Sequence, residues 1–130
     1  MEPNPRRTPF SDAELDEFRD LITTKRTRAL AEIETMRARL RHARESGGDT
    51  AFSLHMADAG TDTADREQTH AMIARQQTFV SHLDRALQRI AHKTYGVCRV
   101  SGEPIARDRL LAVPHTETSI AAKRDEQKRR

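Results

Sequence analysis

The chain has 130 residues, of which 35% are hydrophobic and 33% charged, and its aromatic residues are four Phe and one Tyr. Globular domains average about 45–50% apolar and about 25% charged residues, so the composition excludes a large round core and favours a thin helical body. The 23 Lys and Arg stand against 20 Asp and Glu, and this small net charge of +3 does not favour a general polyanion binder.

The single cysteine, Cys98, excludes an intramolecular disulfide. The sequence shows neither an apolar leader nor a run of about 18 apolar residues that could span a membrane. We therefore expect a cytoplasmic protein that does not insert into a membrane.

Three prolines among the first ten residues oppose helix formation, so residues 1–10 are expected to form a flexible arm. Ser11 and Glu14 then match a capping box, which predicts the start of a helix. Apolar residues recur at spacings of three and four along this helix, and they are Leu15, Phe18, Ile22, Ala29, Ile33, Met36, Leu40 and Ala43. The pair Gly47-Gly48 is expected to end the helix after about 34 residues, or about 50 Å.

A second stripe of residues at helical spacing comprises Met72, Gln76, Phe79, Leu83, Leu87 and Ile90, and its helix is expected to end near Thr94-Tyr-Gly96. A helix with one apolar stripe gains little stability alone, so the two stripes are expected to cover each other. This predicts a mainly α fold, with a long antiparallel two-helix coiled-coil hairpin over residues 11–94 and its tip around residues 47–66. A homodimeric coiled coil is the alternative, and the short connection favours a monomer.

Two smaller parts are expected after the hairpin. Residues 95–116 surround a Ser101-Gly-Glu-Pro104 turn and predict a small lobe that carries a β-hairpin. Its expected packing residues are Val97, Val100, Ile105, Leu110, Leu111, Val113 and Ile120. Residues 117–130 predict a C-terminal helix with a basic tail. The connector over 47–60 is expected to fold back on the hairpin or to contact a partner, because it carries Phe52, Leu54 and Met56.

The sequence offers no anchor for enzymatic chemistry, since it shows no phosphate-binding loop, nucleophile elbow, HExxH helix or paired CxxC. The six histidines are scattered and are interpreted as solvated side chains. An acidic cluster with Asp58 is more informative, because Asp62 and Asp65 lie three residues apart near the expected hairpin tip. Two readings stay open: these carboxylates cap the second helix, or they act on a metal ion or basic pocket beyond the tip.

The spacing around Cys98 is that of a CxxC knuckle whose second ligand, at Ser101, is replaced. The positions of a second knuckle are Ser119 and Ala122, and neither supplies a thiolate. A structural zinc site takes four Cys or His ligands, so no zinc is expected here. Cys98 is interpreted as a small buried hydrophobic residue, with a reactive thiol as the alternative.

Three motifs together resemble a known family: Asp62-x-x-Asp65-Arg66, then Tyr95-Gly-Val-Cys-Arg-Val-Ser-Gly-Glu-Pro-Ile105, then Arg109-Leu-Leu-Ala-Val-Pro114. Over roughly residues 12–125 the chain resembles the DksA/TraR family of bacterial RNA polymerase-binding regulators. The lobe of that family is a four-cysteine zinc finger. Because this chain keeps only the first ligand position, Cys98, the resemblance implies a branch without zinc.

The resemblance also implies how such a protein acts. The hairpin would enter the secondary channel of RNA polymerase, and the tip residues Asp62, Asp65 and Arg66 would alter open promoter complexes without catalysis or base-specific DNA contacts. Glu67 departs from the small residue usual after the tip motif.

Members of the family respond to the stringent-response alarmone ppGpp, which makes it a candidate effector here. The candidate contacts to ppGpp are Arg75, His82 and Lys123. Of the positions that match the basic residues of the family, Arg75 and Lys123 are basic, whereas His82 and Val113 are not lysine or arginine.

Two alternative functions stay open. A Gre-type factor uses a similar acidic hairpin tip to hold magnesium and shorten RNA. A helical scaffold or nucleic-acid-binding protein would instead use the basic tail over residues 123–130, and would show steeply salt-dependent binding.

Overall fold

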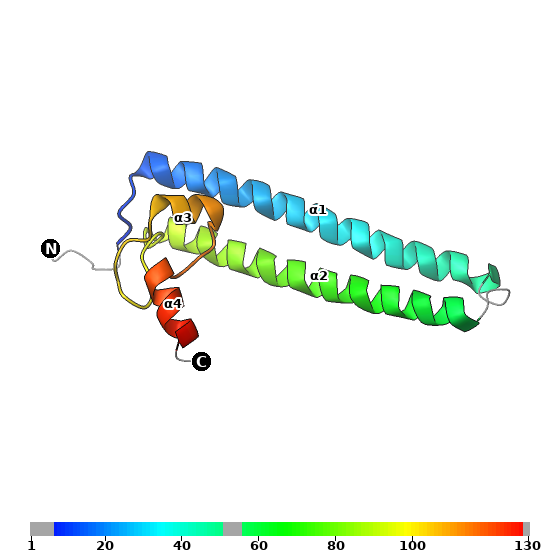
Figure 1. Cartoon of the computed structure of the whole chain (residues 1–130). Coiled ribbons are helices and arrows are strands. Elements are labelled where there is room, and N and C mark those ends of the chain that lie inside the picture. The colour runs from blue at the N-terminus through cyan, green and yellow to red at the C-terminus, as the bar shows by residue number, and fades with distance from the viewer. Residues whose placement is uncertain (1–6, 51–55, 129–130) are drawn as a thin grey trace. The chain divides into compact units, whose positions relative to one another are not determined.

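The computed structural model describes residues 7–50 and 56–128 (Figure 1). Its helices are α1 (Asp12–Thr50), α2 (Met56–Ala91), α3 (Arg107–Ala112) and α4 (Ile120–Lys128). Contacts divide the chain into two compact units, one formed by Met1–Arg26 with Ser81–Arg130 and the other by Thr27–Val80. The mainly helical fold is confirmed, since α1 and α2 pack as a hairpin and the small lobe and C-terminal helix follow. None of the described helices is long and apolar enough to cross a membrane.

The capping box predicted at the start of α1 is present. The Ser11 Oγ accepts the backbone N–H of Glu14 at 3.2 Å, and the Glu14 carboxylate accepts the Ser11 N–H at 3.2 Å. These bonds satisfy N–H groups that lack a partner within the helix, so helix formation begins at Asp12.

The end predicted for α1 is wrong. The helix continues through Gly47-Gly48 to Thr50, and α2 begins at Met56, so the connection is shorter than expected. Glycine costs only about 1 kcal/mol per residue inside a helix, and an established helix extends cooperatively, so two glycines do not stop it. The predicted contacts of Phe52 and Leu54 lie outside the described residues.

The core of the unit Thr27–Val80 shows that the apolar stripe of α2 is shifted from the predicted one. Ile33 and Met36 of α1 are buried together with Ile73 of α2, with Leu40 and Val80 packed against them. Neighbouring helix positions point about 100° apart. The side chain at 72 therefore faces solvent when that at 73 faces α1.

Two predicted stripe residues are exposed in this unit. Ile73 is 7% exposed whereas Met72 is 46% exposed, so the prediction for Met72 is wrong. The predicted stripe residue Ala43 is exposed as well, toward the end of α1.

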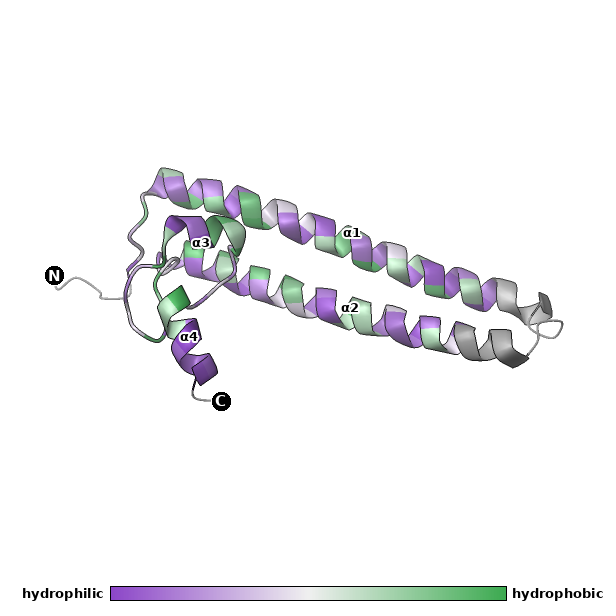
Figure 2. Cartoon of the chain, viewed as in Figure 1, coloured by the Kyte–Doolittle hydropathy of each residue, from purple (hydrophilic) through white to green (hydrophobic). Residues whose placement is uncertain are grey.

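The other unit contains the larger core. Its buried side chains come from α1, α2 and the lobe, and include Leu15, Phe18, Ile22, Leu83, Ile90, Tyr95 and Leu110. Arg26 Nε lies 2.6 Å from Asp84 Oδ1 in this unit, and Gln76 donates to Glu32 in the unit Thr27–Val80. In these two pairs the residue number increases along α1 while that of its partner on α2 decreases, as expected for two antiparallel helices. Hydrophobic and hydrophilic residues are interspersed along the coloured parts of both helices (Figure 2).

Helix α2 ends at Ala91, before the predicted Thr94-Tyr-Gly96, because Lys93 reverses the backbone. Lys93 has φ 61°, its N–H bonds the Ile90 carbonyl at 3.1 Å, and the Thr94 N–H bonds the Arg89 carbonyl at 2.9 Å. This is the bonding pattern of a Schellman C-cap, here without glycine at the left-handed position.

The lobe has little sheet structure. Val97 and Pro104 form one isolated antiparallel bridge, and the Cys98 N–H bonds the Glu103 carbonyl at 2.8 Å. The predicted β-hairpin is therefore reduced to a single bridge within the described part of the lobe. Ile105 and Leu110 are buried as predicted, but three of the expected packing residues are 47–56% exposed, namely Val100, Leu111 and Ile120.

Aromatic residues supply the packing of the lobe that the sequence analysis had assigned to Val100, Leu111 and Ile120. The Tyr95 ring is fully buried, and its hydroxyl donates to the Pro114 carbonyl at 2.8 Å. The Phe10 and Phe18 rings lie 5.1 Å apart, and the Phe18 and Tyr95 rings also lie 5.1 Å apart. The Thr8 N–H bonds the Lys93 carbonyl at 2.7 Å, so residues 7–10 of the proline-rich arm are held against the lobe.

Candidate functional site

The two tip aspartates lie inside α2. Asp62 is the seventh residue of the helix that begins at Met56, and Asp65 follows one turn later. Capping groups act at the first turn of a helix, so the capping interpretation of this pair is wrong. Both side chains are exposed, as are those of Arg66 and Glu67.

The arrangement leaves two carboxylates available to a partner. Residues three apart on a helix share a face, so Asp62 and Asp65 can approach the same target. Carboxylates in such a pair suit a divalent cation or a basic group as target. Among the residues that the structure describes, no group of three or more His, Cys, Asp or Glu side chains could hold a metal ion.

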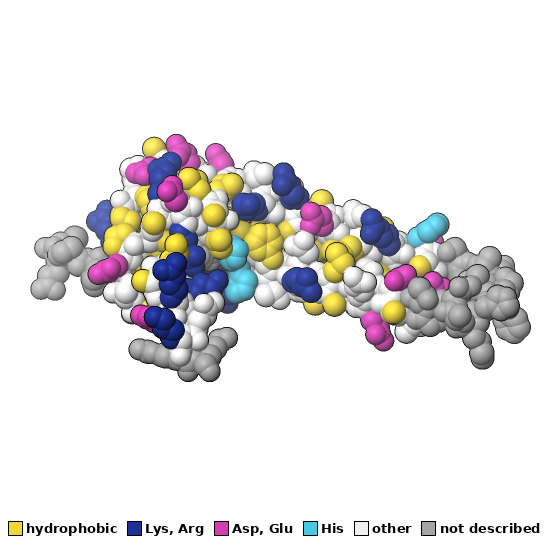
Figure 3. Space-filling model, in the orientation of Figure 1, with side chains coloured by type: hydrophobic (Ala, Val, Ile, Leu, Met, Phe, Trp, Pro, Cys, Tyr) yellow, Lys and Arg dark blue, Asp and Glu magenta, His cyan; other side chains and the backbone are white. Residues whose placement is uncertain are grey.

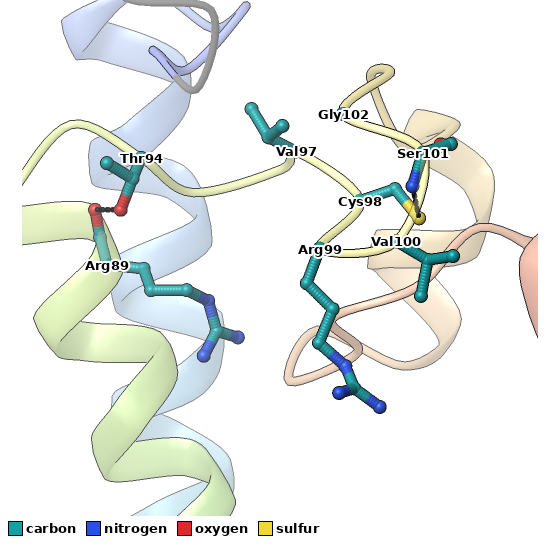
Figure 4. A pocket seen from close by; sticks show the side chains of 8 residues that line it. All are labelled: Arg89, Thr94, Val97, Cys98, Arg99, Val100, Ser101 and Gly102. Atoms are coloured by element: carbon teal, nitrogen blue, oxygen red, sulfur yellow. Dashed lines mark hydrogen bonds between the residues drawn. The ribbon is translucent and has the colours of Figure 1, made fainter.

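The second candidate site is the lobe around Cys98 (Figure 4). The Cys98 side chain is buried, and its Sγ accepts the backbone N–H groups of Ser101 at 3.5 Å and Ser119 at 3.4 Å. Ser119 Oγ in turn accepts the N–H of Ala122 at 3.2 Å, as an N-cap of α4 does. The four knuckle positions are therefore brought together, but by hydrogen bonds and packing.

These residues do not fit a zinc ion. One thiol is present, the Ser119 hydroxyl is engaged as a helix cap, and Ala122 has no donor atom and is buried. A tetrahedral site needs four Cys or His ligands, so three are missing.

The hydrogen bonds around the sulfur change its acidity. Burial by itself raises the pKa of the Cys98 thiol, but the hydrogen bonds from Ser101, Ser119 and Val100 outweigh burial and lower the pKa to about 6. Donors aimed at a sulfur favour its thiolate form, so the Ser101 side chain and the backbone N–H groups here partly replace the cation of a zinc site. Cys98 is buried as predicted, and the lowered pKa favours the alternative of a thiol that ionises more readily than an ordinary cysteine.

A basic pocket of about 300 Å³ lies between α2, the lobe and α4. Its basic and imidazole side chains are those of His82, Arg99, Arg109, His115 and Lys123, and its acids are Glu117 and Glu126. On the face drawn in Figure 3, Lys and Arg side chains gather over α4 and the adjoining lobe, with histidines beside them. The structure thus brings together His82 and Lys123, two of the three predicted effector contacts. Arg75 is exposed and belongs to the unit Thr27–Val80.

Sequence reasoning missed the partner of His82 in this pocket. The rings of His82 and His115 lie 5.7 Å apart, and both side chains are half-buried, so the interpretation of these two histidines as solvated is wrong. Thirty-three positions separate the two residues in the chain, and no spacing rule links them. Only the return of the chain after α3 places His115 beside α2.

Fold and site together define a helical hairpin with a finger-like lobe that has lost three of its four metal-ligand positions. A sequence model described as "Prokaryotic dksA/traR C4-type zinc finger" matches residues 93–128. The solved structure of transcription factor DksA2 from Pseudomonas aeruginosa is 32% identical, covers 90% of this chain and 85% of that chain, and superposes with a TM-score of 0.76. The chain belongs to the DksA/TraR family.

Two curated relatives extend this result. The RNA polymerase-binding transcription factor DksA of Caulobacter vibrioides is 29% identical over 122 residues, which cover 93% of this chain and 82% of that protein. General stress protein 16O of Bacillus subtilis is 37% identical over 71 residues, and the match covers 55% of this chain and 44% of that protein's length. The relatives from Pseudomonas aeruginosa and Caulobacter vibrioides are named as transcription factors, which agrees with the prediction that the chain is not an enzyme.

Proposed function

We propose that this chain is a bacterial transcription regulator that binds RNA polymerase through the secondary channel. In this proposal the hairpin carries Asp62 and Asp65 toward the active centre, and the pair alters the stability of open promoter complexes. The observation that carries the proposal is the position of both carboxylates, which are exposed on one face of α2 beyond its first turn. A relative that covers 93% of the chain is named as RNA polymerase-binding, which supports the choice of partner.

The physical basis is electrostatic. Two carboxylates one turn apart repel each other modestly in water, and a cation or basic group that bridges them replaces this repulsion with attraction. A helix holds them in a fixed relative geometry. Their effect on a polymerase complex should therefore depend on charge more than on side-chain size.

The test is the half-life of open complexes formed by the cognate RNA polymerase, with wild-type protein and with Asp62→Asn plus Asp65→Asn. Wild type should shorten the half-life, and the double variant should bind polymerase without doing so. Asp16→Asn plus Asp20→Asn is the matched control, because it removes two exposed carboxylates from α1 and should behave as wild type.

Three results would contradict the proposal. The first is an unchanged half-life with no polymerase binding, and the second is equal activity of the double variant. The third is shortening of the nascent RNA, which would indicate a Gre-type activity instead.

The proposal includes ppGpp as an effector at the basic pocket, with His82 and Lys123 as contacts. Lys123 and two arginines offer donors to phosphate oxygens in a cavity large enough for a polyphosphate group. Adding ppGpp to the polymerase complex should strengthen the effect of wild type and should change that of Lys123→Ala little. An equal response of both proteins would rule out the pocket as the effector site.

A further inference from the structure

The distal part of α1 carries a run of arginines that the proposed function does not use. Residues 36–44 contain four arginines, one histidine and no acid, and all four arginine side chains are exposed. At about 100° per residue, three of them lie within about 60° of arc on one flank of the helix. These three are Arg37, Arg41 and Arg44, and we call them the arginine row. Arg39 points about 140–160° away from them.

Contacts show that members of the row share one flank. Arg41 Nη2 lies 2.9 Å from the Oε1 atom of Glu34. The hydrogen bond and charge of Arg41 lower the pKa of Glu34, and the charge of Arg37 lowers it as well. Both guanidinium groups therefore lie near this carboxylate. Arg37 and Arg44 form no ion pair with any residue that the structure describes, so the row keeps two cations without a partner of opposite charge.

The row does not stabilise the helix that carries it. Like charges three or four residues apart on a helix repel each other, and these are the spacings within the row. Nearer the start of α1, Arg19 instead pairs with Asp16, three residues before it, at 2.9 Å. A negatively charged partner outside the chain would relieve the repulsion within the row.

The pairing of the two helices sets the row beside the tip acids, within the unit Thr27–Val80. Gln76 of α2 donates to Glu32 of α1. Twelve residues further along α1 lies Arg44, and twelve residues back along α2 lies position 64, next to Asp65. The proposed function directs Asp65 toward the active centre of RNA polymerase, where the growing end of the RNA lies. An RNA strand that reached the tip would therefore run alongside the row.

The chemistry of the row suits a phosphate backbone. A guanidinium group offers two parallel donors that match the oxygens of a phosphate. The rise from Arg37 to Arg44 is about 10 Å, which spans about three phosphates of a stacked strand at about 3.4 Å each. No Phe, Tyr or Trp occurs in residues 19–50, so this part of α1 offers no platform on which bases could stack. Contacts to the backbone alone carry no sequence information.

We propose that the arginine row binds the phosphate backbone of single-stranded RNA without preference for base sequence. The inference rests on the proposed function in so far as it takes this RNA to be the nascent strand at the polymerase active centre. It gives the two helices different roles, because α2 presents carboxylates while α1 holds the strand.

The test is fluorescence anisotropy of the full chain with a labelled single-stranded RNA of about 12 nucleotides, titrated at several salt concentrations. Neutralising one phosphate of a single strand contributes about 0.7 to the slope of log affinity against log salt. Arg37→Gln plus Arg44→Gln should therefore reduce this slope by about 1.4 and weaken binding about tenfold or more at about 0.1 M salt. Wild type should bind A-rich and C-rich strands equally well.

The matched control is Arg28→Gln plus Arg39→Gln. It removes two exposed arginines from the same unit, and the two positions share the other flank of α1. This control should keep the affinity and the salt slope of wild type. Glutamine is a good helix former, and circular dichroism checks that both double variants keep the helical content of wild type.

A second measurement places the contact inside a transcription complex. RNA with 4-thiouridine at its 3′ end, in a stalled complex of the cognate polymerase, is irradiated in the presence of the protein. Cross-links mapped by mass spectrometry should fall on α1 around residues 37–45, and should be lost with Arg37→Gln plus Arg44→Gln. Cross-links confined to the basic tail over residues 123–130 would overturn the inference.

Failure of the inference is distinguishable from failure of the proposed function. If the row variant binds free RNA with wild-type affinity and salt slope, or if wild type binds none, the inference is overturned and the polymerase proposal stands. If the row variant loses polymerase binding and RNA binding is absent throughout, the row contacts an acidic protein surface instead. If wild type binds RNA through the row but does not bind polymerase, the inference holds and the proposed function fails.

Discussion

The sulfur of Cys98 lies 3.4 Å from the backbone nitrogen of Ser119, twenty-one residues further along the chain. In a zinc finger these two positions would be joined through a metal ion. Here the thiol accepts hydrogen bonds while the serine caps α4. The segments around Cys98 and Ser119 therefore stay in contact without a metal ion between them. Tyr95, Ile105 and Leu110 supply its buried apolar packing.

The first prediction concerns metal removal. Because three zinc ligands are missing and the lobe is held by packing and hydrogen bonds, a strong chelator should leave the thermal unfolding midpoint unchanged. Purified protein should contain well under one equivalent of zinc by elemental analysis. A chelator-induced drop of several degrees would show that the lobe does depend on a metal ion.

The second prediction concerns pH and Cys98. In the folded state the pKa of the Cys98 thiol is lowered to about 6, below its value in the unfolded chain. At pH values between these two pKa values, the folded state therefore binds fewer protons than the unfolded state. The stabilisation is therefore fully present above the unfolded pKa and is lost as pH falls through the folded value. Between them, unfolding free energy should rise with pH by at most about 1.4 kcal/mol per unit, the limit for one proton.

The measurement for this second prediction is chemical unfolding at a series of pH values, with thiolate absorbance followed in parallel. Cys98→Ala is the reference, since it lacks the titrating group. A pH slope equal in wild type and Cys98→Ala would contradict the lowered pKa.

The third prediction uses two glycines with the same kind of backbone. Gly96 has φ +85° and Gly102 has φ +74°, so a side chain at either position is strained. A Cβ at Gly96 would also overlap the Phe10 ring and would lie 3.6 Å from Leu110 Cδ1, whereas a Cβ at Gly102 meets nothing within 4 Å. We expect Gly102→Ala to cost about 1 kcal/mol and Gly96→Ala about 2–4 kcal/mol.

Denaturant unfolding of both variants gives the difference directly. Combining Gly96→Ala with Phe10→Ala tests the cause of this difference. Without the Phe10 ring, Gly96→Ala should lower the unfolding free energy by less than it does in the wild-type background. Equal losses at the two glycines would mean that the contact with Phe10 contributes little.

The fourth prediction tests the phase of α2 against α1. Ile73 is 7% exposed in the core with Ile33 and Met36, and Met72 beside it is 46% exposed. Ile73→Ala should therefore lower the unfolding free energy by about 2–4 kcal/mol, and Met72→Ala by less than about 1 kcal/mol. The reverse order would mean that the helix is rotated by one residue, as the sequence pattern had predicted.

The sequence alone determined the features that depend on neighbours along the chain. Three local patterns are of this kind. They are the capping box of Ser11 and Glu14, the repeat of apolar residues along both helices, and the absence of a thiol at the other three zinc-ligand positions, Ser101, Ser119 and Ala122. These patterns were sufficient to predict the hairpin, the lobe and membership of the family. Hydrogen bonding within one turn and burial of one helix face follow from spacing, so spacing predicts them.

Only the tertiary structure decided which of two adjacent residues enters the core and which distant groups meet. Met72 and Ile73 are both apolar, and the choice between them depends on how α1 packs. His82 and His115 become neighbours through the fold of the lobe, and Lys93 takes a glycine-like conformation because the chain must turn there toward Tyr95. Packing free energy sums over contacts between segments distant in sequence, and it overrides weak local preferences of about 1 kcal/mol.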